Sequence, residues 1–247
     1  MRSLRAALGA ILICGLTMAG PAFALPFIGK KQPPAAPKTP TAPTPAKPAQ
    51  TPAPAAPGAA LDVKGFRSAT FGMTPAQVKA AAASDFGAAA KVAEGSNAAD
   101  GTQFVLVSVE HLDPGPGTAQ VGYVFGATSK TLTAVNVVWS TVAEPTEQQR
   151  TAMVQAGQQL AAYFQQGPAP AKTGGLATFG TNGLVLYSAV DKKDSGVEVM
   201  VDGVEYQRTG GDKPLASPPP KGPATLRVSY TQNVDKPDIK AIKPGSF

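Results

Sequence analysis

The chain is poor in residues that bind metals or form covalent cross-links. Its 247 residues include one cysteine, Cys14, and one histidine, His111. Zinc, haem and iron–sulfur sites use sets of cysteine or histidine ligands, so we expect no metal site and no cofactor.

Acidic residues are absent from the first part of the chain. The formal net charge is +6, from 22 basic and 16 acidic residues, yet the first acidic residue is Asp62. From Gly58 onward the basic and acidic residues number 16 each. A nucleic-acid-binding domain needs a basic face to hold phosphates, and a neutral globular part does not supply one by composition. We therefore expect no nucleic-acid partner.

Residues 1–24 have the pattern of a secretory signal peptide. Arg2 and Arg5 precede an uncharged run rich in leucine and isoleucine, and Ala22-Phe23-Ala24 matches the small-residue cleavage motif. Cleavage after Ala24 would remove Cys14 and place the mature chain in the periplasm or outside the cell. The alternative is a retained anchor, because about 20 apolar residues can span a bilayer. Membrane contact is expected only in that case.

Residues 25–60 are predicted to form a disordered linker. The stretch Gln32–Pro57 contains ten prolines, no acidic residue and no large aliphatic or aromatic residue, so it cannot build a core. At about 3.1 Å per residue, a polyproline II rod of this length would span roughly 80 Å. The linker either holds the following domain at a distance from a membrane or cell wall, or acts only as a solubilising leader.

Residues 61–247 are predicted to form one globular domain with two similar halves. In the first half, Thr74-Pro75-Ala76-Gln77 matches a capping box and predicts a helix over 75–86, ended by Gly87. Three strands are expected after it, separated by glycine- and proline-rich turns: Gln103–His111, Ala119–Phe125 and Thr131–Ser140.

The second half repeats this order. Pro145 opens a second helix, Gly167-Pro168 ends it, and Met153, Ala156 and Leu160 begin its apolar stripe. Three more strands are expected: Gly183–Val190, Val197–Tyr206 and Thr225–Thr231. Two tandem α-β-β-β units predict an α+β fold in which helices cover one face of an antiparallel sheet.

The start of the first helix carries a family resemblance. Phe71-Gly72-Met73-Thr74, followed by Gln77-Val78, is similar to the Gly-Met-Thr/Ser helix opening of the outer-membrane assembly lipoprotein BamE and of β-lactamase-inhibitor-protein-like modules. The resemblance implies helices on one face of an antiparallel sheet and a binding role. The chain lacks the lipobox cysteine and the paired cysteines of these modules. Its overall layout resembles that of uncharacterised exported bacterial proteins, which implies no activity.

Polar residues give few catalytic candidates. His111 follows a predicted strand and is interpreted as a surface residue, and no G-x-S-x-G motif is present. Gly126–Thr131 has the look of a phosphate loop but lacks the glycine before the lysine, so a hairpin turn is favoured. A hairpin turn also explains Asp191–Gly196 better than a calcium loop does. Glu198 and Asp202 share a strand face, which a solvated face also explains.

Aromatic residues are the better candidates for contact with a partner. Tyr123, Phe125 and Trp139 lie on adjacent predicted strands, and exposed aromatic side chains often anchor partners. The alternative is that they pack under the helices, because a sheet with few large side chains needs them inside.

These patterns predict a periplasmic or secreted, non-catalytic cell-envelope module, carried on a flexible stalk and acting through protein or envelope contacts. One alternative is a periplasmic hydrolase that uses carboxylates, which converging carboxylates in a pocket would favour. The other is a small-ligand carrier with an apolar cavity.

Overall fold

The computed structural model describes residues 59–88, 90–208 and 215–240. The predicted signal peptide at 1–24, with Cys14, lies outside the described residues, as does the linker up to residue 58. The first described contacts are backbone hydrogen bonds beside the end of the second helix, where Ala169 donates to the Ala59 carbonyl and accepts from the Leu61 amide.

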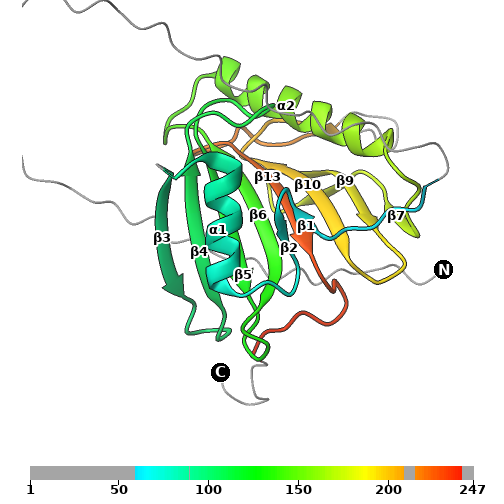
Figure 1. Ribbon diagram of the computed structural model, residues 1–247. Coiled ribbons are helices and arrows are strands. Elements are labelled where there is room, and N and C mark those ends of the chain that lie inside the picture. The colour runs from blue at the N-terminus through cyan, green and yellow to red at the C-terminus, as the bar shows by residue number, and fades with distance from the viewer. Residues whose placement is uncertain (1–58, 89, 209–214, 241–247) are drawn as a thin grey trace, which may run out of the picture. The chain divides into compact units, whose positions relative to one another are not determined.

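The described chain folds around one antiparallel sheet of nine strands (Figure 1). In spatial order the strands are β3, β4, β5, β6, β13, β10, β9 and β7, and β8 pairs with β9 beside β7. The fold is α+β, as predicted from the sequence. The strands are β3 (Lys91–Ser96), β4 (Gln103–Val109), β5 (Ala119–Phe125), β6 (Leu132–Ser140), β7 (Lys172–Gly174), β8 (Ala177–Phe179), β9 (Gly183–Val190), β10 (Gly196–Asp202) and β13 (Thr225–Thr231).

The two halves of the domain meet at the centre of the sheet. In each half, the strands run in chain order from an outer edge of the sheet to its middle. The last strand of the first half, β6, therefore lies beside the last strand of the second half, β13. These two strands pair antiparallel over seven residues, with Val137 opposite Val228. The sheet is therefore continuous across the boundary between the halves.

One face of the sheet is the core. Val107, Val121, Val137, Val228 and Val199 are direct neighbours on successive strands, so their side chains share a face. All five are buried, with no more than 2% of their surface exposed. Apolar burial on this face is the main stabilising contribution to the fold.

Both helices cover this core face (Figure 1). Helix α1 (Pro75–Phe86) begins at Thr74 with the predicted capping box and buries Val78 and Ala82. Helix α2 (Glu147–Gln165) begins at Thr146 with a second capping box and buries Met153, Ala156, Gly157 and Ala161. In each box the N-cap and N3 side chains satisfy backbone groups that the helix start leaves unpaired.

A small hairpin lies between the helices on the same face (Figure 1). It consists of β1 (Gly65–Phe66) and β2 (Ala69–Thr70). The Phe66 ring packs against Tyr230 of β13 at 5.5 Å between centroids, and Phe164 of α2 stacks on Tyr187 of β9 at 5.7 Å. A second two-stranded sheet, β11 (Gln207–Arg208) and β12 (Leu215–Ala216), lies in the connection between β10 and β13.

The predicted elements are confirmed at α1 and at most strands, and α2 is confirmed as a helix that begins at Glu147, two residues after the predicted Pro145, because Thr146 is its N-cap. The bounds of α1, β5, β9 and β13 agree with the sequence prediction, and β6 differs by one residue. Residues 110–111 fall outside β4, and β10 ends at Asp202, so the prediction of a strand continuing to Tyr206 is wrong. Gly203 takes a φ of +69°, which turns the chain out of the sheet.

The prediction of three strands per half missed one edge strand in the first half, β3, and two in the second half, β7 and β8. β3 has the sequence Lys-Val-Ala-Glu-Gly-Ser, and five of its six residues are exposed. β7 and β8 are three residues each and almost wholly exposed. These edge strands lack the alternation of buried and exposed residues that reveals a strand, since neither of their faces is deeply buried.

Gly157 allows α2 to approach the sheet closely. A Cβ at this position would lie 2.7 Å from Leu186 Cδ1 and 2.9 Å from Val201 Cγ1. We expect Gly157→Val to destabilise the domain by about 1–3 kcal/mol through overpacking. Ala162→Val, on the exposed side of the same helix, should cost less than about 1 kcal/mol. Urea unfolding of both variants checks this, and equal losses would contradict the close approach.

Candidate functional site: the open face of the sheet

The three aromatic candidates lie in the core. Tyr123, Phe125 and Trp139 are at most 2% exposed and face the helices, in agreement with the alternative in which they pack inside. Trp139 Nε1 donates to the Leu112 carbonyl at 3.0 Å. The Tyr123 hydroxyl has no hydrogen-bond partner among the described residues, and burial raises its pKa. As they are placed, none offers a surface to a partner.

The loop that resembles a phosphate loop is a hairpin turn, as predicted, and it holds a carboxylate of the chain itself. The backbone amides of Thr128 and Ser129 each donate to the Asp238 carboxylate at 2.9 Å. These bonds hold the pKa of Asp238 down at about 2. The loop therefore fastens the segment that follows β13.

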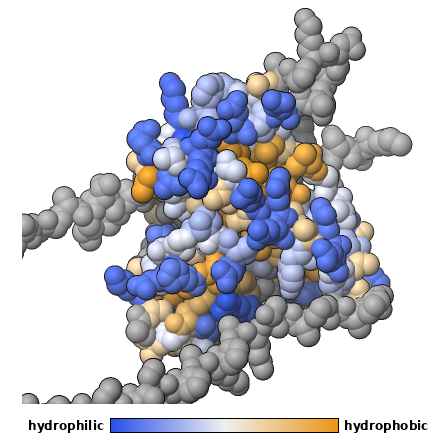
Figure 2. Space-filling view, turned by 90° about the horizontal axis from the view of Figure 1, so that it is seen from above, coloured by the Kyte–Doolittle hydropathy of each residue, from blue (hydrophilic) through white to orange (hydrophobic). Residues whose placement is uncertain are grey.

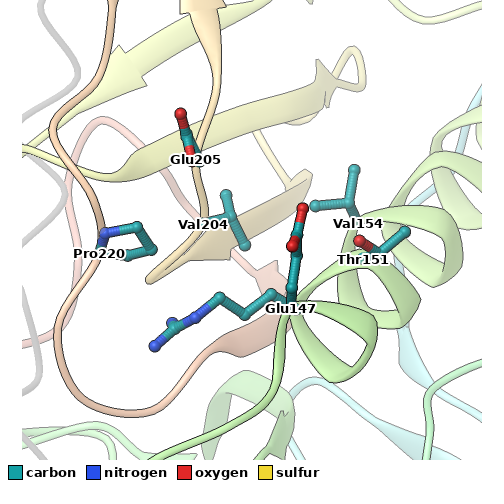
Figure 3. Close-up of a pocket in the computed structure, with 7 residues that line it drawn as sticks. Glu147, Thr151, Val154, Val204, Glu205 and Pro220 are labelled. Carbon is teal, nitrogen blue, oxygen red and sulfur yellow. The ribbon is translucent and has the colours of Figure 1, made fainter.

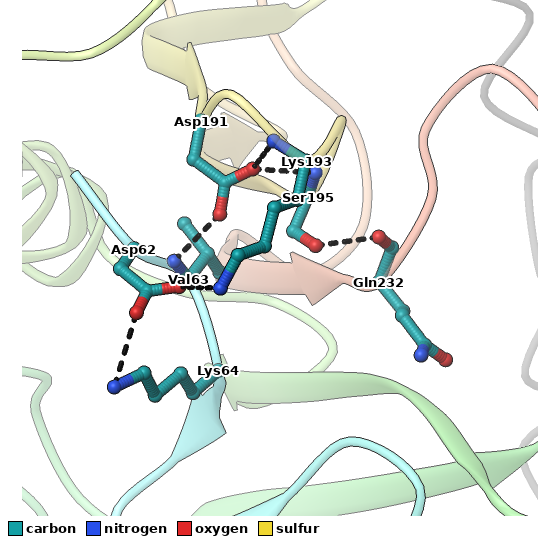
Figure 4. A network of polar contacts seen from close by, with 7 residues as sticks. All are labelled: Asp62, Val63, Lys64, Asp191, Lys193, Ser195 and Gln232. Atoms are coloured by element: carbon teal, nitrogen blue, oxygen red, sulfur yellow. Dashed lines mark hydrogen bonds and ion pairs between the residues drawn. The ribbon is translucent and has the colours of Figure 1, made fainter. Parts of the chain in front are cut away.

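Asp191 organises the turn between β9 and β10 (Figure 4). Its buried carboxylate accepts backbone amides from Lys193 and Ser195 in the turn and from Val63 at the start of the domain, at 2.7–3.0 Å. Lys193 also pairs with Asp62 at 3.1 Å. The described residues contain no group of three metal-ligating side chains. The hairpin prediction for 191–196 is confirmed, and Asp191 fastens the N-terminal segment.

A shallow pocket of about 300 Å³ lies at the N-terminus of α2 (Figure 3). This volume is at the lower end of the range for small-molecule sites. Glu147 and Glu205 both line it, which bears on the hydrolase alternative. Both residues are exposed, and the two carboxylates lie apart in Figure 3, so they do not converge on one point of the pocket.

Arg150 in the same pocket has a structural role. Its guanidinium donates to the carbonyls of Gly203 and Gly222, which joins α2 to the ends of the β10–β13 connection. Seen from above, the hydrophobic surface on this side of the molecule is broken into small areas between hydrophilic residues (Figure 2). Neither the Arg150 contacts nor this divided hydrophobic surface indicates a binding site.

His111 is exposed in the loop after β4, in agreement with its interpretation as a surface residue.

The opposite face of the sheet is different, because every described helix and the β1–β2 hairpin lie on the core face. We call it the open face. Its central row consists of direct neighbours across six strands: Leu106, Gly122, Asn136, Ser229, Glu198 and Ser188. Around this row lie the apolar side chains of Phe104, Val124, Val138, Val185 and Met200. Most of these side chains are half-buried by one another.

Polar groups at the centre of the open face are only partly paired. Ser229 Oγ donates to Asn136 Oδ1 at 2.8 Å, and Arg227 donates to the Met200 sulfur at 2.9 Å. Glu198 Oε1 is buried and has no hydrogen-bond partner among the described residues. Burial raises the pKa of Glu198, and the nearby charge of Arg227 acts in the opposite direction. A buried acceptor without a partner costs about 1–3 kcal/mol, so a donor there would be stabilising.

Comparisons with known proteins give no match to a family model, to a curated protein or to a solved structure. In the described part of the chain, no helix has the length and apolar character needed to span a membrane. The open face is thus defined by the geometry of this chain alone. The even spacing of Glu198 and Asp202 predicts that they share a strand face, but nothing local in the sequence joins Glu198 to Arg227, which belongs to a strand beyond a long connection.

The first prediction from these contacts concerns Asp191. Asp191→Asn replaces one acceptor oxygen by an amide that opposes a backbone N–H, and we expect a loss of about 1–3 kcal/mol. Asp194→Asn breaks an exposed ion pair with Lys172 and should cost less than about 1 kcal/mol. Urea unfolding measures both losses. Faster amide hydrogen exchange at Val63 in the Asp191 variant alone would locate the effect, and unchanged exchange would contradict it.

The second prediction concerns pH. Because the folded-state pKa of Asp238 lies below its ordinary value of 3.8, its stabilisation is complete above about pH 4 and is lost as the pH falls toward 2. The urea midpoint of Asp238→Asn should therefore lie below that of the native chain at pH 6 and converge with it near pH 2. Asp235→Asn, at an exposed position, is the control. A constant difference across this range would refute the role of the ionised carboxylate.

Proposed function

We propose that this chain is an exported, non-catalytic module of the cell envelope that acts through protein contacts made by the open face. The single observation that carries the proposal is the buried carboxylate oxygen of Glu198 at the centre of that face, for which residues 59–88, 90–208 and 215–240 supply no hydrogen-bond donor. Isolated buried acceptors are rare in folded proteins, and a partner that supplies a donor removes the cost.

The composition of the open face supports the same proposal. Apolar side chains and polar ones alternate there, and Arg227 and Met200 belong to residue types that are enriched at protein interfaces. The lysines on this face, Lys91 and Lys172, are on the outermost strands, where the rim of an interface is normally charged. The fitting partner is a flat protein surface, about half apolar, with a basic group to meet Glu198 and an acidic group to meet Arg227.

The expected export and the proline-rich stretch agree with a module of this kind. A signal peptide at 1–24 would deliver the chain to the periplasm or the outside, and a linker of roughly 80 Å would let the domain reach a partner at a distance from its anchor or from the cell wall.

Site-specific photo-crosslinking in the producing cells tests this function. A photoreactive residue at Gln120, exposed on the open face, should yield one adduct of defined mass. The same residue at Gln158, exposed on α2, should yield less than about one-tenth as much, since α2 lies on the other side of the sheet. Phe104→Asp should reduce the Gln120 adduct by about tenfold or more because it places a charge in the interface.

Two results would contradict the proposal. One is an equal yield of adducts from Gln120 and Gln158, which indicates contact without a preferred face. The other is the absence of any adduct from Gln120 while the domain remains folded, as judged by the near-ultraviolet circular dichroism of the buried Trp139.

A further inference from the structure

We infer that the partner of the open face is a second copy of this chain, so that two sheets pack face to face as an isologous dimer. This inference rests on the proposed function. The open face itself carries the groups that its partner needs, since apolar side chains surround one acidic group, Glu198, and one basic group, Arg227.

The two charged groups are neighbours. In the strand register, Glu198 of β10 lies directly opposite Ser229 of β13. Arg227 lies two residues before Ser229 on the same face of β13, directly opposite Met200 of β10. A two-fold axis that crosses between Glu198 and Arg227 places each Glu198 opposite the Arg227 of the other copy. An isologous interface forms every such contact twice, so one adjacent pair of charges gives two identical pairs between the copies.

The unsatisfied groups match this arrangement. Glu198 Oε1 lacks a donor among the described residues. The guanidinium of Arg227 donates, within the described chain, one hydrogen bond through Nη2 to the Met200 sulfur, which is a weak acceptor. A guanidinium carries five N–H donors in a planar fork that suits a carboxylate. The second copy therefore offers each group a partner that the described part of its own chain does not provide.

The size of the face suits a stable dimer. With strands about 4.8 Å apart and about 3.3 Å per residue, six to eight strands of about seven residues cover roughly 700–900 Å² per copy. Two copies would bury roughly 1,400–1,800 Å² in total, within the range of standard specific interfaces. Two sheets packed face to face lie about 10 Å apart, a distance that the side chains of both faces can fill.

Charge reversal and analytical ultracentrifugation of residues 25–247, from about 1 to 100 µM, test the inference. The native chain should be a dimer. Glu198→Arg and Arg227→Glu should each raise the dimer dissociation constant by about 100-fold or more, because each places like charges opposite one another. The double variant should dimerise again, and an equimolar mixture of the two single variants should form a heterodimer. Glu144→Arg, at an exposed position before α2, should leave the dimer unchanged.

The outcomes separate this inference from the proposed function. A native chain that is monomeric over the whole range overturns the inference. If Gln120 then crosslinks to a different protein, the proposed function stands, and if it crosslinks to nothing, both fail. A dimer that survives both single reversals, or a mixture that does not form heterodimers, also overturns the inference, because the interface then lies elsewhere.

Discussion

The pairing of β6 with β13 is the constraint on which the rest of the structure depends. It joins two halves, each made of a helix followed by strands, in a register that sets Val137 opposite Val228. Since side chains alternate between the faces of a strand, a slip of one residue would turn the apolar residues of the second half toward the other side. The observed register places the apolar faces of both halves together, so α1 and α2 share one core and the other face is left continuous.

Polar contacts at the ends of the sheet hold the segments that enter and leave it. Asp191 binds the backbone of Val63, and Asp238 binds the turn between β5 and β6. Backbone amides of the chain itself donate hydrogen bonds to both carboxylates, so neither carboxylate indicates a ligand. Glu198 differs because one of its oxygens is buried and receives no hydrogen bond from the part of the chain that the structure describes. Among these three carboxylates, the one with a buried acceptor and no donor among the described residues is therefore on the open face.

The sequence is sufficient to predict the elements whose signals are local. Thr74 and Gln77 mark the start of α1, and the alternation of Leu226, Val228 and Tyr230 with polar residues marks β13. The strand β3 is missed because an exposed edge has no alternation to detect. The burial of Tyr123, Phe125 and Trp139 follows from which face the helices cover, and that depends on register between distant strands. For the same reason, the sequence does not show that Glu198 and Arg227 are neighbours, because this depends on the register between β10 and β13.

The central claim is that the helices cover one face of this sheet, while the other face, which no described helix covers, docks a partner. The chain from Leu25 has no cysteine, so a single cysteine reports on one position. Val137 and Val138 are adjacent on β6 and point to opposite faces. In dilute solution, a maleimide should label Val138→Cys rapidly and Val137→Cys only on unfolding, and rising protein concentration should protect Val138→Cys. Equal labelling at both positions, or protection of Val138→Cys in the dilute monomer, would contradict the account.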